Sequence, residues 1–521
     1  MTPRILALLV LLLASALPVS PAPPAPPESE SVRLRRFFEE HWASRLRESP
    51  ELATYFGSPN AGWSDLSPES TARVYDTARE KLAALSAIDR SRLSASEQVN
   101  YDLFRRRLER TLEGQRFHEI GCYLLIGHMS GVDLQLVQLL DYMPARTVAD
   151  HDALLARLRG FPRVVDQTLA LLARGLETGI TPPRVTLRDV PERVASLLGS
   201  ESPVLAPFRR LPETLPAADR ERLRAEADRV FAGQVEPALR KLRDFLAETY
   251  VPRARESIAL SALPDGDALY VFQLRTSTTT DLSPEQIHQL GLSEVRRIRG
   301  EMEALIAATG FRGSFAEFST YLRTDPRFFY DRPEDLVAGY RDLAKRIDPL
   351  LIQFFGRLPR LPYGVKPLPA NGAKSAPAGY YNNGSFATGQ PAWFLVNTDD
   401  LKARPKWAMA ALTLHEAVPG HHLQYGIAQE LEDLPEWRRW DVYPAFAEGW
   451  ALYAEGLGSE LGLYDDPYSN FGRLSNEMWR AVRLVADTGL HARGWTRLQA
   501  IDYYLAHTAR SAHEVENEVD R

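Results

Sequence analysis

Residues 414–422 have the sequence Leu-His-Glu-Ala-Val-Pro-Gly-His-His, which indicates more about the chemistry of this protein than any other stretch of the chain. It follows an apolar run, Trp407 to Thr413, which is too short to span a membrane and long enough for a buried helix. A His-Glu pair on a buried helix is typical of zinc sites. The imidazole nitrogen binds Zn²⁺, and a neighbouring glutamate that is not a ligand can accept a proton from water.

The spacing of this motif differs from H-E-x-x-H, because Pro419 stands where the second histidine would be. On an unbroken helix His422 would share the face of His415 but lie about 10.5 Å further along the axis. Proline removes a backbone hydrogen bond and crowds the carbonyl of His415, and Gly420 relaxes the dihedral limits. We therefore predict a bulge or break, and one added residue per turn would return His421 to the face of His415. The alternative is a helix that ends at Pro-Gly with solvated histidines.

The composition is that of an ordinary globular protein. Of the 521 residues, 45% are hydrophobic and 25% are charged, which is enough material for a large core. The formal net charge of -6 leaves no excess of positive charge for a phosphate backbone, so we expect no nucleic-acid partner. The single cysteine, Cys122, excludes an internal disulfide.

The first residues have the features of an export signal. Arg4 supplies a short positive segment, Ile5–Leu13 is apolar, and Ala14–Ala16 offers a cleavage site. We predict a signal peptide over residues 1–16, extending to about residue 22, and a proline-rich linker over residues 17–30. The apolar run is short for a transmembrane helix, and no cysteine that could carry a lipid lies near it. These features predict an exported protein, periplasmic or secreted, with no membrane anchor after signal cleavage.

Beyond this segment the apolar periodicity is mostly helical, and we predict two lobes. Residues 31–255 form an N-terminal helical lobe and residues 256–521 a catalytic lobe, with a hinge near Val251 to Ser261. Just after the hinge, Leu269–Leu274 is rich in β-forming residues and predicts a short strand. Ser283, Pro284 and Gln286 then predict the start of a helix, with Ser283 as its N-cap.

A second strand is predicted closer to the motif. Ala392–Val396 is an apolar run that follows a segment rich in Pro, Gly, Ala and Asn. An extended peptide could pair with the edge of such a strand. We therefore expect a small β-sheet near the metal helix, with Trp393–Val396 as the strand that would accept a peptide.

A third metal ligand is predicted on the next helix. Glu448 and Glu455 lie two turns apart on one face of the run Phe446–Glu455, among aromatic and small residues. Carboxylates in apolar surroundings need partners, and a metal ion supplies one. Glu448 would complete a His₂Glu site. Glu455 would not bind the metal but would hold a ligand histidine in place. The alternative is that both belong to the exposed edge of an amphipathic helix.

A polar stripe follows on a largely apolar helix. Arg480, Arg483, Asp487 and His491 fall within about 80° of one another around the helix axis. Such a stripe is either the solvent side or one wall of a polar cavity. In the second case Asp487 would hydrogen-bond His491, and His491 would stabilise the oxyanion formed when water attacks a carbonyl.

Four ordered blocks resemble the DUF885 family, a group of mostly bacterial, often exported proteins related to zinc metallopeptidases of the gluzincin type. The blocks are Leu414–Gln424 (L-H-E-A-V-P-G-H-H-L-Q), Leu260–Leu292, Phe446–Glu455 (F-A-E-G-W-A-L-Y-A-E) and Arg483–Trp495. Four blocks in order are far more specific than one short motif, and the resemblance covers most of the mature chain.

The resemblance implies a mainly α-helical, two-lobed, metallopeptidase-like fold with a deep central groove and the metal helix at its floor. It implies that His415 and His421 hold one Zn²⁺ per chain, with Glu448 matching the third ligand and Glu416 as the base. His422 remains open as an alternative second ligand. The family pattern continues after a segment like Glu514–Arg521, so the resemblance also implies a further wall of the groove beyond residue 521.

The leading functional hypothesis is therefore an exported zinc-dependent peptidase that acts on a peptide or another small substrate. His422, Glu455, Arg483 and Asp487 would support the metal centre or the substrate, and Glu416 and His491 would act in catalysis. Two rival hypotheses remain at this stage. One is a metal-dependent hydrolase of a non-peptide ester or amide, and the other is an inactive peptide-binding protein.

Overall fold

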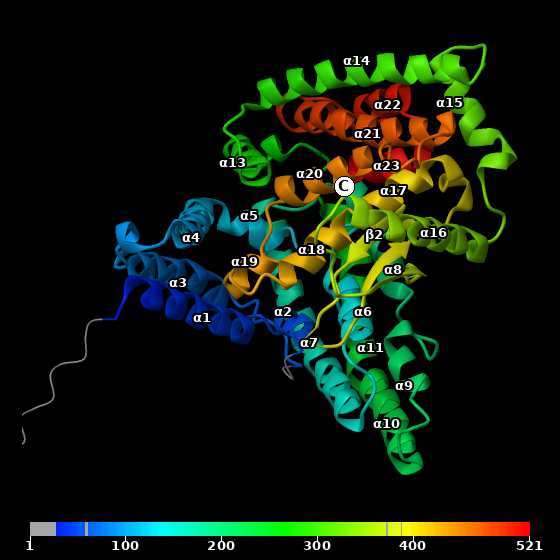
Figure 1. Ribbon diagram of the computed structural model, residues 1–521. Helices are drawn as coiled ribbons and strands as arrows, with labels where there is room; N and C mark the ends of the chain where they lie inside the picture. Colours follow the sequence, from blue (N-terminus) through cyan, green and yellow to red (C-terminus); the bar gives the residue numbers. More distant parts are fainter. Residues whose placement is uncertain (1–27, 58–60, 371–372, 387) are drawn as a thin grey trace, which may run out of the picture.

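The structure is a computed structural model that describes residues 28–57, 61–370, 373–386 and 388–521 (Figure 1). The predicted signal peptide and most of the proline-rich linker lie outside these residues. The described chain is mainly helical and contains one small three-stranded sheet, which confirms the predicted fold class. No described helix combines the length and the apolar character that crossing a membrane requires.

The helices of the N-terminal part of the chain pack around two large apolar clusters. The helices are α1 (Glu30–Glu48), α2 (Pro50–Tyr55), α3 (Pro68–Ser86), α4 (Ala95–Glu113), α5 (His118–Tyr123), α6 (Val132–Tyr142), α7 (Val148–Thr178), α8 (Val190–Ala195), α9 (Ala206–Arg209), α10 (Ala217–Val230), α11 (Glu236–Phe245) and α12 (Val251–Arg253). One cluster lies between α6, α7, α8, α10 and α11, with Phe161 and Leu239 fully buried. The other joins α1, α3 and α4 around Phe104.

The remaining helices surround the motif. They are α13 (Gly266–Thr278), α14 (Pro284–Ala308), α15 (Phe315–Thr324), α16 (Pro333–Ile347), α17 (Met409–Glu416), α18 (His421–Gln429), α19 (Glu436–Trp440), α20 (Pro444–Leu457), α21 (Pro467–Ala492), α22 (Arg497–His507) and α23 (Ala512–Asp520). In Figure 1, α14 runs along α21, and α17 lies below them near the middle of the molecule. Gly472 allows α21 to pack closely against the segment that precedes α17, since a Cβ at this position would lie 1.9 Å from the carbonyl oxygen of Trp407.

The sheet contains β1 (Tyr363–Pro367), β2 (Gly379–Asn382) and β3 (Ala392–Val396) in the order β1-β3-β2. β3 pairs in parallel with β1 and antiparallel with β2, so that Phe394 lies opposite both Val365 and Tyr381. Apolar side chains of β1 and β3 pack against α16 and α17, with the Tyr340 and Phe394 ring centroids 5.1 Å apart. The predicted strand at Ala392–Val396 and its place near the motif are confirmed.

The two predictions made just after the hinge had opposite outcomes. Ser283 caps α14 through a reciprocal capping box with Gln286, as predicted. The predicted strand at Leu269–Leu274 is wrong, because these residues belong to α13. Gly266, Leu269 and Tyr270 are buried at helical spacing, and this tertiary burial overrides the β-propensity of the segment.

Candidate metal centre and its cavity

The motif forms two short helices instead of one. α17 ends at Glu416 and α18 begins at His421, which confirms the predicted break at Pro419-Gly420. A Cβ at Gly420 would lie 2.0 Å from the His415 carbonyl oxygen, so only glycine lets the chain turn back this closely. The indole of Trp450 donates to the carbonyl oxygen of Pro419 at 2.8 Å and fixes the turn from α20.

The break brings His421 beside His415. Their ring centroids are 4.7 Å apart, and Glu448 from α20 faces both rings. Glu448 Oε2 lies 3.4 Å from His415 Nε2, and Oε1 lies 3.7 Å from His421 Nε2. One ligand atom from each of the three residues lies within 4.8 Å of the others. Two imidazoles and a carboxylate in this arrangement are a donor set that suits Zn²⁺.

Glu455 lies behind His415, as the sequence predicted. Its Oε1 is 2.8 Å from His415 Nδ1, and its side chain is only 1% exposed. A proton on Nδ1 would be held by this carboxylate, which leaves Nε2 free to face Glu448 and His421. Glu455 is therefore placed to orient the imidazole of His415.

His422 points away from this group. Its Nδ1 lies 3.2 Å from the phenol oxygen of Tyr381, and its ring packs against Tyr363 with the centroids 4.5 Å apart. Burial lowers the pKa of His422 to about 4, so the ring is neutral near pH 7. The geometry thus groups His421, and not His422, with His415 and Glu448.

The charges at the centre shift the protonation of its members. Burial opposes the charged form of His415, but hydrogen bonds to Glu448 and Glu455 outweigh it and raise its pKa to about 9. The hydrogen bond to His415 holds the pKa of Glu448 down, to about 2. Burial lowers the pKa of His421 to about 4. Without a metal, the proton of the group therefore resides on His415.

Glu416 lies at the end of α17 and is 7% exposed. Burial raises the pKa of its carboxyl group to about 7, and a hydrogen bond from the backbone N–H of Tyr381 acts in the opposite direction. A carboxyl group with a pKa near neutral can accept a proton at pH 7 and release it again. Its position beside the His415 and Glu448 group suits the base predicted from the sequence.

The centre opens into a cavity of about 560 Å³. Its walls come from the segment that leads into β2, from α17, α18, α20 and α21, and from the C-terminal residues. His415, Glu416, His421 and Glu448 line it together with Tyr381, Tyr425, Arg480, Arg483, Arg510 and Glu518. Aromatic rings, guanidinium groups and the candidate metal ligands thus share one space.

The strand beside the cavity is not the one predicted. β3 is paired on both sides, so Trp393–Val396 has no free edge for a peptide. β2 is an edge strand, and Gly379, Tyr380 and Tyr381 line the cavity. The sequence prediction failed because the order of strands depends on long-range pairing that no local pattern reveals.

The residues of the polar stripe on α21 lie in different surroundings. Arg483 lines the cavity and pairs with Glu518 through two contacts of 2.5 and 3.0 Å. Asp487 instead accepts a hydrogen bond of 2.6 Å from the Tyr270 hydroxyl. His491 lines a separate cavity, and its Nδ1 accepts a hydrogen bond from the backbone N–H of Leu260 at 3.0 Å.

The predicted catalytic placement of His491 is therefore wrong. His491 shares a helix face with Arg480, but eleven residues of helix separate the two by about 16 Å along the axis. Sequence spacing gives the angle around a helix correctly and says nothing about which part of the helix reaches the site.

Two site residues received no role from the sequence. Arg480 Nη2 lies 3.1 Å from both ring nitrogens of His415 and 3.7 Å from Glu448 and Glu455. The sequence feature that could have indicated this role of Arg480 is its place in the polar stripe. Tyr381 contacts Glu416 through its backbone and His422 through its hydroxyl. Nothing in the local sequence around Tyr381 indicates either contact.

The sequence pattern of the family described as "Bacterial protein of unknown function (DUF885)" matches residues 50–521. The chain belongs to the DUF885 family. The match includes the four blocks on which the resemblance was based, so the predicted membership is confirmed. No curated protein matches the chain.

Two solved structures share the DUF885 fold of this chain. One is the crystal structure of a protein described as the putative lipoprotein from Colwellia psychrerythraea, with 26% sequence identity and a TM-score of 0.88. The other, described as a putative lipoprotein of unknown function from Shewanella oneidensis, has 16% identity and a TM-score of 0.64 and supports the fold alone. Each alignment covers 95% of this chain and 89% of the other.

Proposed function

We propose that this DUF885 protein is a zinc-dependent hydrolase that cleaves peptide bonds. The observation that carries the proposal is the convergence of His415, His421 and Glu448 within 4.8 Å, at the wall of a cavity that also contains Glu416. This donor set would leave one zinc coordination position open, as catalytic zinc sites require.

The residues present fit a metal ion. Glu455 holds Nδ1 of His415, so the lone pair of Nε2 is directed toward the other two donors. Ligand histidines in zinc proteins usually have such a carboxylate partner. The raised pKa of His415 and the lowered pKa of Glu448 show that the group already attracts a positive charge, which zinc would supply in place of the proton.

Zinc held by His415, His421 and Glu448 would supply a Lewis acid that polarises the scissile carbonyl and lowers the pKa of water. Glu416 accepts a proton from the attacking water as the water oxygen bonds to the carbonyl carbon. The same carboxyl group then delivers this proton to the amide nitrogen as the C–N bond breaks. His491 takes no part, because it lies in another cavity.

The open edge of β2 offers backbone groups to an extended substrate. Tyr381 already turns its N–H toward the cavity, where it contacts Glu416. A peptide laid along β2 would pair with the strand and pass the metal centre, whereas a compact ester offers no such backbone groups. This edge is the feature that favours a peptide substrate over a non-peptide ester or amide.

We also infer that the protein is exported. The similar protein from Colwellia psychrerythraea is described as a putative lipoprotein, and lipoproteins are exported proteins. The signal peptide predicted from the sequence of this chain also supports export. A fusion of residues 1–30 to a reporter that is active only outside the cytoplasm should give signal, and substitution of the Ile5–Leu13 run with polar residues should abolish it.

The decisive experiment compares wild type with Glu416→Gln. The purified protein should contain one zinc ion per chain by elemental analysis and should cleave members of a peptide library. Glu416→Gln should retain zinc and lose about 10²- to 10⁴-fold in kcat/KM, because only the proton acceptor is removed.

The control is Glu460→Gln, since Glu460 is exposed and lies outside the cavity. A protein that binds no stoichiometric zinc contradicts the proposal. Zinc binding with cleavage of esters only, or with peptide binding and no turnover, would instead support the two rival hypotheses.

A further inference from the structure

The wall of the cavity formed by α21, by the residues around α23 and by the segment after β3 is rich in arginine. Five guanidinium groups line it, and outside the metal group two carboxylates, Glu514 and Glu518, balance part of their charge. The arginines are Arg404, Arg480, Arg483, Arg510 and Arg521, of which Arg521 has a half-exposed side chain beside Glu518. The two positive charges of a zinc ion would match Glu416 and Glu448, so the positive excess of this wall remains when the metal is bound.

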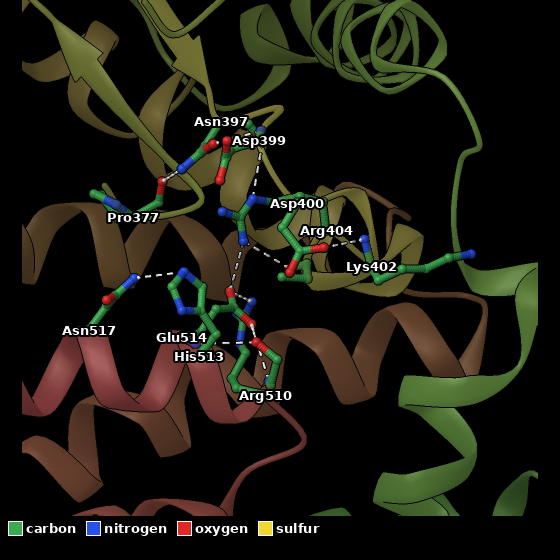
Figure 2. Close-up of polar contacts among 12 residues, drawn as sticks. Pro377, Asn397, Asp399, Asp400, Lys402, Arg404, Arg510, His513, Glu514 and Asn517 are labelled. Atoms are coloured by element: carbon green, nitrogen blue, oxygen red, sulfur yellow. Dashed lines mark hydrogen bonds and ion pairs between the residues drawn. The ribbon is translucent and has the colours of Figure 1, made fainter. Parts of the chain in front are cut away.

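Two of these arginines have close carboxylate partners of their own. Arg483 pairs with Glu518 through two contacts. Arg404 is 6% exposed and donates to the carbonyl oxygen of Asn397 at 3.1 Å and to Glu514 at 3.2 Å. Figure 2 shows Arg404 reaching from the segment after the sheet to Glu514 on α23. Both arginines therefore hold the wall together.

Arg480 and Arg510 differ from this pair. Among the described residues, neither has a carboxylate oxygen closer than 3.7 Å, and the carboxylates near Arg480 are Glu448 and Glu455 of the metal group. Both donate a hydrogen bond to Asn476. Arg510 donates to its side-chain oxygen at 2.5 Å, and Arg480 donates to its backbone oxygen at 3.5 Å. The two guanidinium groups thus line the same cavity and share Asn476 as a contact.

The orientation of Arg510 is fixed by its surroundings. Its guanidinium carbon lies 5.7 Å from the ring of Trp407 and 5.9 Å from the ring of Trp479. Contacts of this kind hold the planar group in one place before a ligand arrives. A preorganised guanidinium beside a second one matches a carboxylate, which can accept two parallel hydrogen bonds from an arginine.

We propose that Arg480 and Arg510, which both contact Asn476, form a subsite for a carboxylate group of the substrate. The inference rests on the proposed peptidase function and specifies its substrate class. Because Arg480 also contacts His415, the carboxylate would lie close to the scissile bond. Its source is either the free C-terminus of a peptide or the side chain of an aspartate or glutamate.

The test uses the zinc-loaded full chain and peptides that share one core sequence. One peptide has a free C-terminus and no acidic residue, a second is amidated with an acidic residue, and a third is amidated and neutral. We expect kcat/KM for at least one of the first two to exceed that of the third by about 10- to 100-fold, the usual worth of hydrogen bonds to a charged group. Preference for the first identifies the terminal carboxylate, and preference for the second identifies the side chain.

The variants are Arg510→Gln, Arg510→Lys and Arg480→Gln, with zinc content measured for each. Arg510→Gln should reduce the preference to nearly one with zinc retained, and Arg510→Lys should restore part of it, because lysine keeps the charge without the planar fork. Arg332→Gln, a surface arginine whose side chain is 70% exposed, should change nothing.

Equal cleavage of all three peptides by wild type would overturn the inference and leave the peptidase proposal intact. A preference that survives in both Arg510→Gln and Arg480→Gln would also overturn it. If no peptide is cleaved, the peptidase proposal fails, and binding of the same peptides to zinc-loaded Glu416→Gln, followed by fluorescence anisotropy, decides the subsite on its own. Tighter binding of a carboxylate-bearing peptide supports the subsite, and equal binding refutes it.

Discussion

His415 is the proposed zinc ligand whose protonation is most changed by its surroundings. It lies between Glu448 on one side of the ring and Glu455 on the other, and these carboxylates raise its pKa to about 9. In the metal-free protein the imidazole is therefore protonated near pH 7. Because the folded-state pKa exceeds the usual value of 6.5, the associated stability is complete below pH 6.5 and is lost as the pH rises through 9.

Zinc must displace this proton, so its affinity should depend on pH. Between pH 7 and pH 9 we expect the apparent affinity to rise by about tenfold per pH unit, and above pH 9 it should level off. His421 adds no slope in this range, because its pKa is about 4. Competition with a chelator of known zinc affinity across this range measures the slope. A flat profile from pH 7 to pH 9 would show that His415 does not exchange its proton for the metal.

The identities of the site residues were largely predictable from the sequence, but their neighbours were not. His415, Glu416, His421, Glu448 and Glu455 all follow from a motif and from carboxylates placed among apolar residues. Arg480 and Tyr381 reach the same centre from segments far away in the sequence, where a local pattern carries no information about the contact.

The break between α17 and α18 is the element on which the metal centre depends. The sequence predicted it, since proline and glycine together cannot continue a helix. It did not predict that the turn would pass so close to the end of α17 that no side chain fits at residue 420.

Gly420→Ala tests this element. The added Cβ would lie 2.0 Å from the carbonyl oxygen of His415 and 2.3 Å from that of Leu414, so the turn has to shift and carry His421 with it. We expect a loss of about 1–3 kcal/mol in the free energy of unfolding, together with weaker zinc binding. Urea unfolding and zinc titration measure the two effects.

Gly456→Ala is the matched control in α20, because a Cβ at that position meets no atom within 4 Å. It should leave zinc binding unchanged and raise the free energy of unfolding by about 0.5–1 kcal/mol, as alanine does in a helix interior. Equal behaviour of the two variants would mean that the close turn at Gly420 is not required.

At the scale of the whole molecule, a charge cluster around the buried Asp520 joins residues that are more than 300 positions apart in the sequence. Asp520 on α23 has a side chain that is 3% exposed, and it accepts hydrogen bonds from Arg188 and Arg497, each with a shortest contact of 2.6 Å. Arg188 lies between α7 and α8, so the cluster attaches α23 to the N-terminal part of the chain.

Asp520→Asn should weaken this attachment. The amide keeps the shape of the side chain but cannot match two guanidinium groups, and we expect a loss of about 1–3 kcal/mol in the free energy of unfolding. Asp502→Asn, an exposed position on α22, serves as the control and should change the stability by less than about 0.5 kcal/mol. A result for Asp520→Asn as small as that for the control would show that the cluster contributes little.

Contacts of this kind explain why the overall arrangement was harder to predict than the helices. Periodicity and capping residues locate α14 and the strand β3, because these signals are local. The order of the strands, the helical state of Leu269–Leu274 and the pairing of Arg188 with Asp520 depend on residues that are distant in sequence. The division of the chain into two lobes at residue 255 remains a prediction.

The position of β2 has one more consequence. An unpaired strand edge is a template on which other protein molecules can aggregate, and proteins usually protect such edges with charges, bulges or covering loops. Here the strand is only four residues long and lies at the wall of the cavity. A four-residue strand at a cavity wall gives another folded protein little edge to pair with, whereas a single extended chain needs only a few backbone groups. The same placement that would admit a substrate thus also keeps the protein from sticking to its own copies.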